Sequence, residues 1–282
     1  MNRTKDSAIH NGKLGSAIYK FLTYLAIFIT VGVILSIIGY IVVKGIPELK
    51  PELFEMKYTS DNGSMMPAIF NTIIMVILAL LIAIPLGVGA AIYLCEYAKM
   101  GSKFVKLVRL TSETLAGIPS IIFGLFGSLF FVRVCRLNLS MWSGSLTIAI
   151  MILPMIMRTS EEALLTVPMS YKMGSFGLGA GRLRTITKIL LPSAMPGILA
   201  GVLLATGRIV GETVALLFTA GSVAEVALNL TKSGRTLAVH MYALSTEGMS
   251  IDKSYATAFV LLIIVLILNA LSSLVAKKLT KE

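Results

Sequence analysis

The run FLTYLAIFITVGVILSIIGYIVV, residues 21–43, has 23 residues and no charged side chain. A helix needs about 20 apolar residues to cross the hydrocarbon core of a membrane. The run is too long for the apolar part of a secretory signal peptide, which has roughly 7–15 residues. We therefore expect it to be retained as a transmembrane helix.

The rest of the chain continues this apolar character. Of its 282 residues, 56% are hydrophobic and 14% are charged, whereas about a quarter of a soluble domain is charged. Six apolar segments are long enough to span a membrane: 17–43, 67–95, 110–133, 138–160, 193–221 and 254–276. We predict an all-α membrane protein with six transmembrane helices.

The positions of lysine and arginine predict the orientation of these helices. With a cytoplasmic N-terminus, the inner segments hold fifteen of the 25 Lys and Arg residues and the outer segments hold eight. Cytoplasmic segments carry the excess of positive charge, so we expect both termini in the cytoplasm. The net charge of +11 follows the topology rather than forming a nucleic-acid surface. Cys95 and Cys135 would lie on opposite sides, too far apart for a disulfide.

The spans divide the chain into four parts. We expect a cytoplasmic tail over 1–16, the first transmembrane helix over 17–43, an extracytoplasmic loop over 44–66 and a five-helix core over 67–282. Within that core, an inward-facing loop over 169–192 is long enough to have structure of its own. An outward-facing loop contains TLAVHMYALS, residues 236–245, which we expect to form a short helix on the outer surface.

Two charged residues lie deep in the fifth span, in TGRIVGET, residues 206–213. Arg208 and Glu212 are four residues apart, so they would share one face of a helix. Charges at such depth usually line a substrate path, although a self-neutralising structural pair is the alternative. A guanidinium matches the geometry of oxyanions, which favours an anionic solute. We predict that Arg208, Glu212 and the adjacent Thr213 line the path.

A second charged cluster lies near the inner end of the fourth span. Arg158 is close in sequence to Glu161 and Glu162, and the third span carries Glu113 near its inner end. We include Arg158 among the path candidates. The alternative is an interfacial arginine that is paired with a neighbouring acid. Prolines and glycines also interrupt the spans, either because they permit close packing or because broken helices line a path.

No motif indicates catalysis or a bound cofactor. The chain has no G-x-x-x-x-G-K-[ST] motif, so we expect it to bind no ATP through a P-loop. No His, Cys and carboxylate cluster has the spacing of a metal site, and no Ser-His-Asp arrangement is indicated. We predict a membrane protein that is not an enzyme and that binds neither a metal nor a cofactor.

The inward-facing loop contains GLGAGRLRTITKILLP, residues 177–192. No strand precedes its glycines, so the context of a phosphate-binding loop is missing. We predict a glycine turn followed by a short basic amphipathic helix, whose apolar face holds Leu183, Ile186, Ile189 and Leu190. Such a helix could lie on the membrane surface or dock in a cleft of a partner protein.

The stretch from 173 to 192 resembles the cytoplasmic loop of binding-protein-dependent ABC importer permeases, E-A-A-x(3)-G-x(9)-I-x-L-P. Met173-Gly174-Ser175 stand in place of E-A-A. In that family the loop forms a coupling helix that docks on the ATPase subunit. The resemblance implies this role for Gly177, Leu178, Gly179, Ala180, Arg182, Ile189, Leu191 and Pro192.

Four further stretches resemble the Pst-type phosphate-uptake permeases, and among these the PstA subunits. They are LAGIPSIIFGLFG (115–127), EEALLTVP (161–168), GRIVGETVALLFTAG (207–221) and TLAVHMY (236–242). The resemblance implies a permease that moves inorganic phosphate by alternating access across a bacterial or archaeal cytoplasmic membrane. It also implies three partners: a PstC-type permease in a heterodimer, an ATPase dimer that uses ATP and Mg²⁺, and an extracytoplasmic phosphate-binding protein. A permease for phosphonate, sulfate or molybdate and an ion-coupled secondary carrier are the alternatives.

Overall fold

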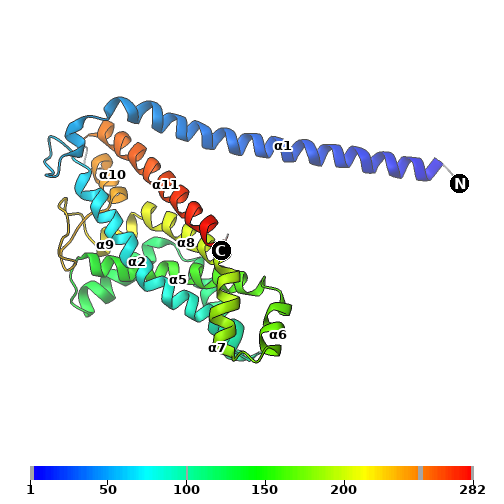
Figure 1. Ribbon diagram of the computed structural model, residues 1–282. Coiled ribbons are helices and arrows are strands. Elements are labelled where there is room, and N and C mark those ends of the chain that lie inside the picture. The colour runs from blue at the N-terminus through cyan, green and yellow to red at the C-terminus, as the bar shows by residue number, and fades with distance from the viewer. Residues whose placement is uncertain (1–2, 100, 247–249, 281–282) are drawn as a thin grey trace.

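A computed structural model describes residues 3–99, 101–246 and 250–280 (Figure 1). Helices, turns and irregular loops make up these residues, and no strand occurs among them. Five helices are long and apolar enough to cross a membrane, and there are six spans if one sharply bent pair is counted as a span. The prediction of an all-α protein with six membrane segments is confirmed in this sense.

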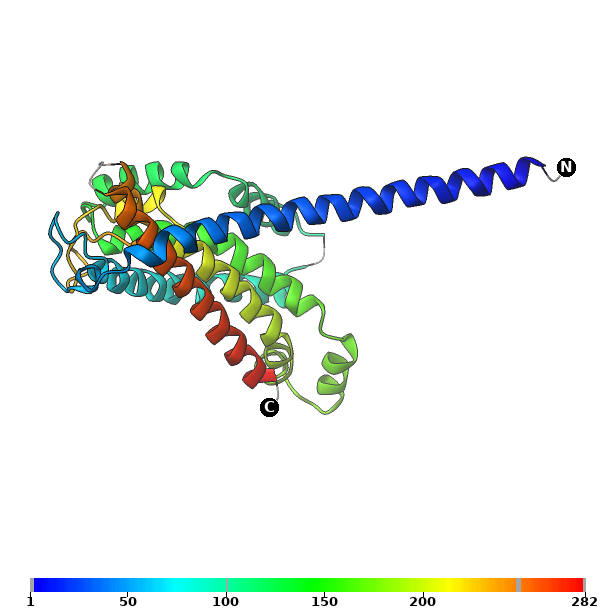
Figure 2. The ribbon, with the colours of Figure 1, turned by 90° about the horizontal axis from the view of Figure 1, so that it is seen from above.

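The first helix, α1, projects away from the rest of the molecule (Figures 1 and 2). It runs over Arg3–Gly45, and none of its most apolar stretch of 18 residues is buried. Its contact with the rest of the molecule is near its C-terminal end, where Tyr40 Oη lies 3.3 Å from Tyr255 Oη. A Cβ on Gly45 would overlap the Tyr255 carbonyl at 2.7 Å, so a side chain there would push the two helices apart.

Three helices form the centre of the core. They are α2 (Met66–Ile92), α5 (Met141–Leu165) and α8 (Leu191–Gly211). Helix α5 lies between the other two and contributes fully buried side chains such as Ile152. Glycines permit these helices to approach closely, since a Cβ on Gly87 of α2 would lie 2.8 Å from Ile156 Cγ2.

The predicted span over 110–133 is not a single helix. It consists of α3 (Lys103–Ala116), then α4 (Ser120–Gly127) and the π-helical turn η4 (Ser128–Val134). The two parts are bent by 102° at Gly117–Pro119, where proline cannot supply the amide that would continue the α3 ladder.

The predicted fifth span, 193–221, is also wrong at both ends. One continuous helical rod covers Arg182–Gly211, made of α7 (Arg182–Thr185), the π-helical turn η5 (Ile186–Leu190) and α8. The rod ends at Gly211, Glu212 is extended, and the short helix α9 follows over Val214–Thr219. Helix α11 (Ile251–Thr280) supplies the last span.

The expected short helix in the 222–253 segment is present as α10 (Leu237–Thr246), but it does not lie on the surface. Leu237, His240 and Leu244 are buried, because the helix packs against α2 and α11. The His240 Nε2 atom lies 3.2 Å from the carbonyl oxygen of Gly63, in the segment between α1 and α2. That segment contains two short 3₁₀ helices, η1 (Ile46–Glu48) and η2 (Pro51–Phe54).

Candidate functional site

Arg208 lies in the last turn of α8, on a side of the helix that the residues described by the structure leave uncovered. Its neighbours Ile209 and Val210 are buried in the core, while Arg208 is half-buried. A Cβ on Gly207 or Gly211 would meet no atom within 4 Å. Among the described residues, the Arg208 guanidinium has no hydrogen-bond or ion-pair partner. An uncompensated cation therefore faces open space beside α8.

Glu212 does not share a helix with Arg208, so the prediction that the two lie on one helix face is wrong. The backbone of Glu212 is extended, with φ −73° and ψ 127°, because α8 has ended one residue earlier. Its carboxylate accepts a hydrogen bond from the amide of Ala215 at 3.1 Å and so caps α9. Glu212 is buried, and Thr213 beside it is half-buried and lies at the break itself.

The short helices that follow the two helix interruptions, at Gly117–Pro119 and at Glu212, lie side by side. Helix α4, which follows the bend at Gly117–Pro119, packs against α9, which follows the break at Glu212. A Cβ on Gly124 of α4 would lie 2.8 Å from the Ala215 Cα atom, so the two backbones are in close contact. Pairs of short helices after a break are typical of a region that lines a path or moves.

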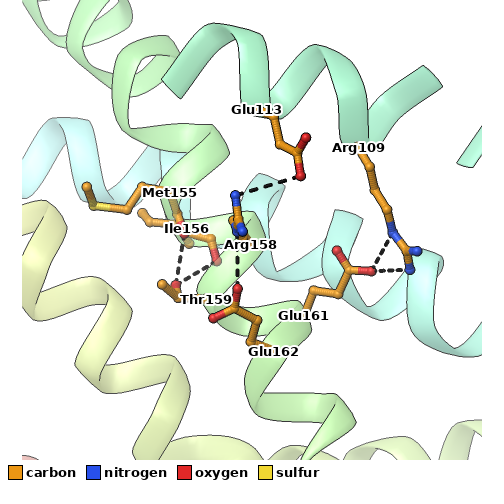
Figure 3. A network of polar contacts seen from close by, with 8 residues as sticks. All are labelled: Arg109, Glu113, Met155, Ile156, Arg158, Thr159, Glu161 and Glu162. Atoms are coloured by element: carbon orange, nitrogen blue, oxygen red, sulfur yellow. Dashed lines mark hydrogen bonds and ion pairs between the residues drawn. The ribbon is translucent and has the colours of Figure 1, made fainter. Parts of the chain in front are cut away.

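Arg158 is in a different environment from Arg208. It lies on α5, and its guanidinium is 3.1 Å from Glu162 and 3.8 Å from Glu113 of α3 (Figure 3). Next to it, Arg109 Nε donates to Glu161 Oε1 at 2.9 Å (Figure 3). These residues line a cavity of about 220 Å³. With three carboxylates and two guanidiniums, the cluster has no net positive charge to offer an anion in this conformation.

The predicted coupling segment folds differently from expectation. The separate short helix is α6, over Met169–Gly177, and it comes before the glycine turn rather than after it. The segment after the turn starts the long helical rod that continues through Leu191 and Pro192 into α8. Leu183 is exposed, whereas Ile186 is buried against the core, so the predicted apolar face is also wrong in part.

Gly179 ends α6. Its φ of +80° is a left-handed conformation that favours glycine. The amide of Ala180 donates to the Ser175 carbonyl at 3.1 Å, and that of Gly179 donates to the Phe176 carbonyl at 2.9 Å. This pair of hydrogen bonds is the Schellman pattern of a helix C-terminus. The glycine is therefore required by backbone geometry and not by contact with a phosphate.

The remaining predicted coupling residues surround this turn. Gly177 is the last residue of α6, and Leu178 beside it is 91% exposed. Arg182 begins the long rod and lies over the ring of Tyr97 at 4.8 Å. Ile189 is half-buried further along the rod.

Helix α6 presents an apolar surface that the described part of the chain leaves exposed. No residue of α6 is buried. Four of its large apolar side chains are exposed: Met169, Tyr171, Met173 and Phe176. Exposed apolar surface of this kind is typical of a site that contacts another protein or a membrane.

The sequence profile of binding-protein-dependent transport system inner membrane components matches residues 83–281. The chain belongs to this family. It is 32% identical to the probable ABC transporter permease protein YqgI of Bacillus subtilis over 99% of each chain. It is 33% identical to the phosphate transport system permease protein PstA of Pasteurella multocida, with 92% of this chain and 94% of that protein covered.

Solved structures of ABC transporters share the fold. A bacterial ABC transporter involved in the import of the acidic polysaccharide alginate superposes with a TM-score of 0.67 at 16% identity, over 95% of this chain and 99% of that chain. The MetNI methionine ABC transporter superposes with a TM-score of 0.58 at 18% identity, over 77% and 94%. The predictions of a permease family and of a multi-pass membrane protein without enzymatic activity of its own are confirmed.

The ion pair between Lys172 and Glu96 was not predicted from the sequence. Lys172 Nζ of α6 lies 2.6 Å from Glu96 Oε2 in η3, the π-helical turn over Tyr93–Tyr97 that continues α2. Glu96 comes at the end of a long apolar run and is buried. A buried carboxylate in that position requires a cation, and this requirement was the available signal.

Proposed function

We propose that this chain is one membrane-spanning subunit of an ATP-driven importer of inorganic phosphate. The observation that carries the proposal is the relationship to a phosphate transport system permease along nearly the whole chain. The geometry adds Arg208, a half-buried guanidinium without a partner among the described residues. A guanidinium donates two parallel hydrogen bonds to an oxyanion, which suits phosphate.

A second permease subunit of the PstC type would complete the path. Two surfaces of this chain are open: the exposed apolar helix α1 and the side of α8 that carries Arg208. We infer that the heterodimer covers both surfaces, so that Arg208 faces the path between the subunits. Substrate would leave Arg208 when the paired helices α4 and α9 rearrange, and Glu212, which caps α9, would move with them.

We infer that α6 is the helix that docks on the ATPase. Its exposed apolar side chains supply the contact, and Met173 occupies the place of the glutamate in the family pattern. ATP and Mg²⁺ would be bound by an ATPase dimer and no cofactor by this chain. In this arrangement α6 and both termini lie in the cytoplasm, while the segment between α1 and α2 receives a phosphate-loaded binding protein.

The test is uptake of labelled phosphate by proteoliposomes that contain this chain, the second permease, the ATPase and the binding protein. We expect ATP-dependent uptake of phosphate in preference to sulfate. Uptake of sulfate, molybdate or a phosphonate in preference to phosphate would change the substrate. Uptake without the ATPase would favour a secondary carrier and contradict the proposal.

Substitutions at Arg208 test the path. Arg208→Gln should abolish uptake without preventing assembly, since the charge is lost from an open surface. Arg208→Lys should lose part of the uptake, because lysine keeps the charge but not the fork of donors. Arg133→Gln, at an exposed arginine in η4, is the matched control and should transport normally. Normal uptake by Arg208→Gln would remove this residue from the path.

A further inference from the structure

Helix α6 is held to the rest of the chain by few side-chain contacts. One is a hydrogen bond of 2.9 Å between the hydroxyls of Ser175 and Thr185. It joins α6 to α7, the next helix of the same inward-facing segment. The other is the ion pair of Lys172 with Glu96 at 2.6 Å. The ion pair links α6 to the span that contains α2, whereas the hydrogen bond links α6 to the rod that continues into α8.

A cavity lies beside this ion pair. It has a volume of about 590 Å³ and is lined by residues of η3, α3, the end of α5 and α6. Both Lys172 and Glu96 belong to its lining. Helix α6 therefore stands apart from the core across a hollow, and the ion pair joins the two sides.

The turn η3 receives two contacts from the inward-facing segment. Lys172 reaches Glu96, and Arg182 lies over the ring of the adjacent Tyr97 at 4.8 Å. Since η3 continues α2 without a break, a displacement of this turn acts on the end of α2. Helix α2 in turn packs along α5 through the centre of the core.

We propose that the Lys172–Glu96 ion pair is the strut that transmits movement of α6 to α2. This inference rests on the proposed coupling role of α6. The pair resists separation because both groups are largely buried, where an unpaired charge is costly. It resists compression because the two atoms are already in contact at 2.6 Å. Lys172 and Glu96 thus act as positioning residues and touch neither phosphate nor ATP.

The first test is the ratio of phosphate taken up to ATP hydrolysed by the reconstituted complex. We expect Lys172→Met and Glu96→Gln each to lower this ratio about tenfold, a typical size for coupling between sites. Lys188→Met is the control, since Lys188 is an exposed lysine of the same segment without an ion pair among the described residues. Its ratio should be unchanged. Equal ratios for the Lys172→Met variant and the unaltered complex would overturn the proposal.

A variant with the two charges exchanged distinguishes a coupling role of the ion pair from a general requirement of the two residues for folding. The double variant Lys172→Glu with Glu96→Lys restores opposite charges across the same hollow. We expect it to recover most of the ratio lost in Lys172→Met. If the single variants fail to assemble with the ATPase, recovery of assembly and of the ratio in the exchanged pair still supports the strut. Failure of the exchanged pair to recover either would overturn it.

A distance measurement tests the strut without any transported solute. Spin labels are placed at Ser170→Cys on α6 and Tyr93→Cys on η3, in the full complex with Cys95→Ser and Cys135→Ser. We expect the distance between the labels to stay constant between the nucleotide-free and the vanadate-trapped states. With Lys172→Met it should change between these states. A distance that varies in the unaltered pair overturns the strut, whereas absence of phosphate uptake contradicts only the proposed function.

Discussion

Helices α1 and α5 differ in how much of each is buried within the chain, and the order is the opposite of the one that hydropathy suggests. The most apolar stretch of the span that contains α1 has a mean hydropathy of 2.7, and none of it is buried. The corresponding stretch of α5 has a mean hydropathy of 1.4, and 67% of it is buried. The more polar helix is thus the centre of the core. In a membrane the lipid is as apolar as a protein interior, so strong hydropathy does not by itself indicate burial within the chain.

Hydrogen bonds from hydroxyl groups to backbone carbonyls explain how α5 can carry polar side chains and still be buried. The buried Thr147 donates to the Ser143 carbonyl at 2.7 Å, and Ser143 donates to the Asn138 carbonyl at 2.8 Å. These two buried hydroxyls therefore have backbone acceptors, as a low-dielectric interior requires, whereas the buried Ser160 Oγ atom of the same helix has no hydrogen-bond partner among the described residues. The small side chains of α5 also permit α2, α4 and α8 to pack against it. Substitutions on the two helices should accordingly have very different effects.

The largest effect is expected for the core isoleucine of α5. Ile152→Ala removes a fully buried side chain and should lower the free energy of unfolding by about 2–5 kcal/mol. Ile34→Ala on α1, where the side chain is 51% exposed, should change it by less than about 0.5 kcal/mol. Thermal unfolding of the purified chain in detergent measures both. Equal losses would show that α1 is packed in the isolated chain.

A smaller difference is expected for two helical glycines. Gly87→Ala places a Cβ 2.8 Å from Ile156 Cγ2 on α5 and should destabilise the chain by about 1–3 kcal/mol. Gly39→Ala on α1 meets no atom within 4 Å and should be neutral or slightly stabilising, because alanine favours the helix. The same unfolding assay compares them. A stable Gly87→Ala variant would mean that α2 and α5 can move apart without cost.

The pH dependence of the free energy of unfolding should come from His240, which is buried in α10. Burial, together with the charge of Arg235, lowers the pKa of His240 to about 3. An unfolded histidine has a pKa near 6.5, so the unfolded chain binds the extra proton below that pH and stability falls between pH 6.5 and about 3.

At pH 5.5 the loss relative to pH 7.5 should be about 1.4 kcal/mol. His240→Gln should remove this part of the dependence, since glutamine can still donate to Gly63 but does not titrate. Thermal unfolding of both proteins at the two pH values measures the difference. An unchanged slope in His240→Gln would assign the dependence to other groups.

The smallest effect is expected at the start of α5. Ser140 accepts a hydrogen bond from the Ser143 amide at 3.2 Å and caps the helix, so Ser140→Ala should cost about 1 kcal/mol. Ser36 of α1 only donates to the Gly32 carbonyl one turn earlier, so Ser36→Ala should have almost no effect. Calorimetry or a thermal shift resolves the two. A cost at Ser36 as large as at Ser140 would contradict the comparison.

The sequence predicted roughly where the membrane segments lie, because hydropathy depends on the residue types in a segment, but it gave the wrong bounds for the fifth span. It left open whether proline and glycine break the third and fifth spans, and the structure has a bend at Gly117–Pro119 and a helix end before Glu212. Proline and glycine are common within membrane helices, where neighbouring helices can satisfy the freed backbone groups. Whether such a helix continues therefore depends on tertiary packing, which a single sequence does not reveal.

The geometry predicted for the site residues was wrong in part, and their roles stay predictions. The spacing of Arg208 and Glu212 indicates a shared face only if the helix continues, and it ends at Gly211. The glycine turn at Gly179 was placed correctly, since a left-handed residue leaves a direct signal in the sequence. The pair of Lys172 and Glu96 joins distant parts of the chain, so it required the fold to be known.

The bare surface of α1 has a consequence for how the protein is made. Among the described residues, α11 packs against α1 near its C-terminal end, and the most apolar stretch of α1 stays uncovered. An unassembled subunit thus displays a long apolar helix that membrane proteases and chaperones can recognise. Cells that produce this chain without its partner subunits should degrade it rapidly, so matched synthesis of the subunits would govern how much transporter accumulates.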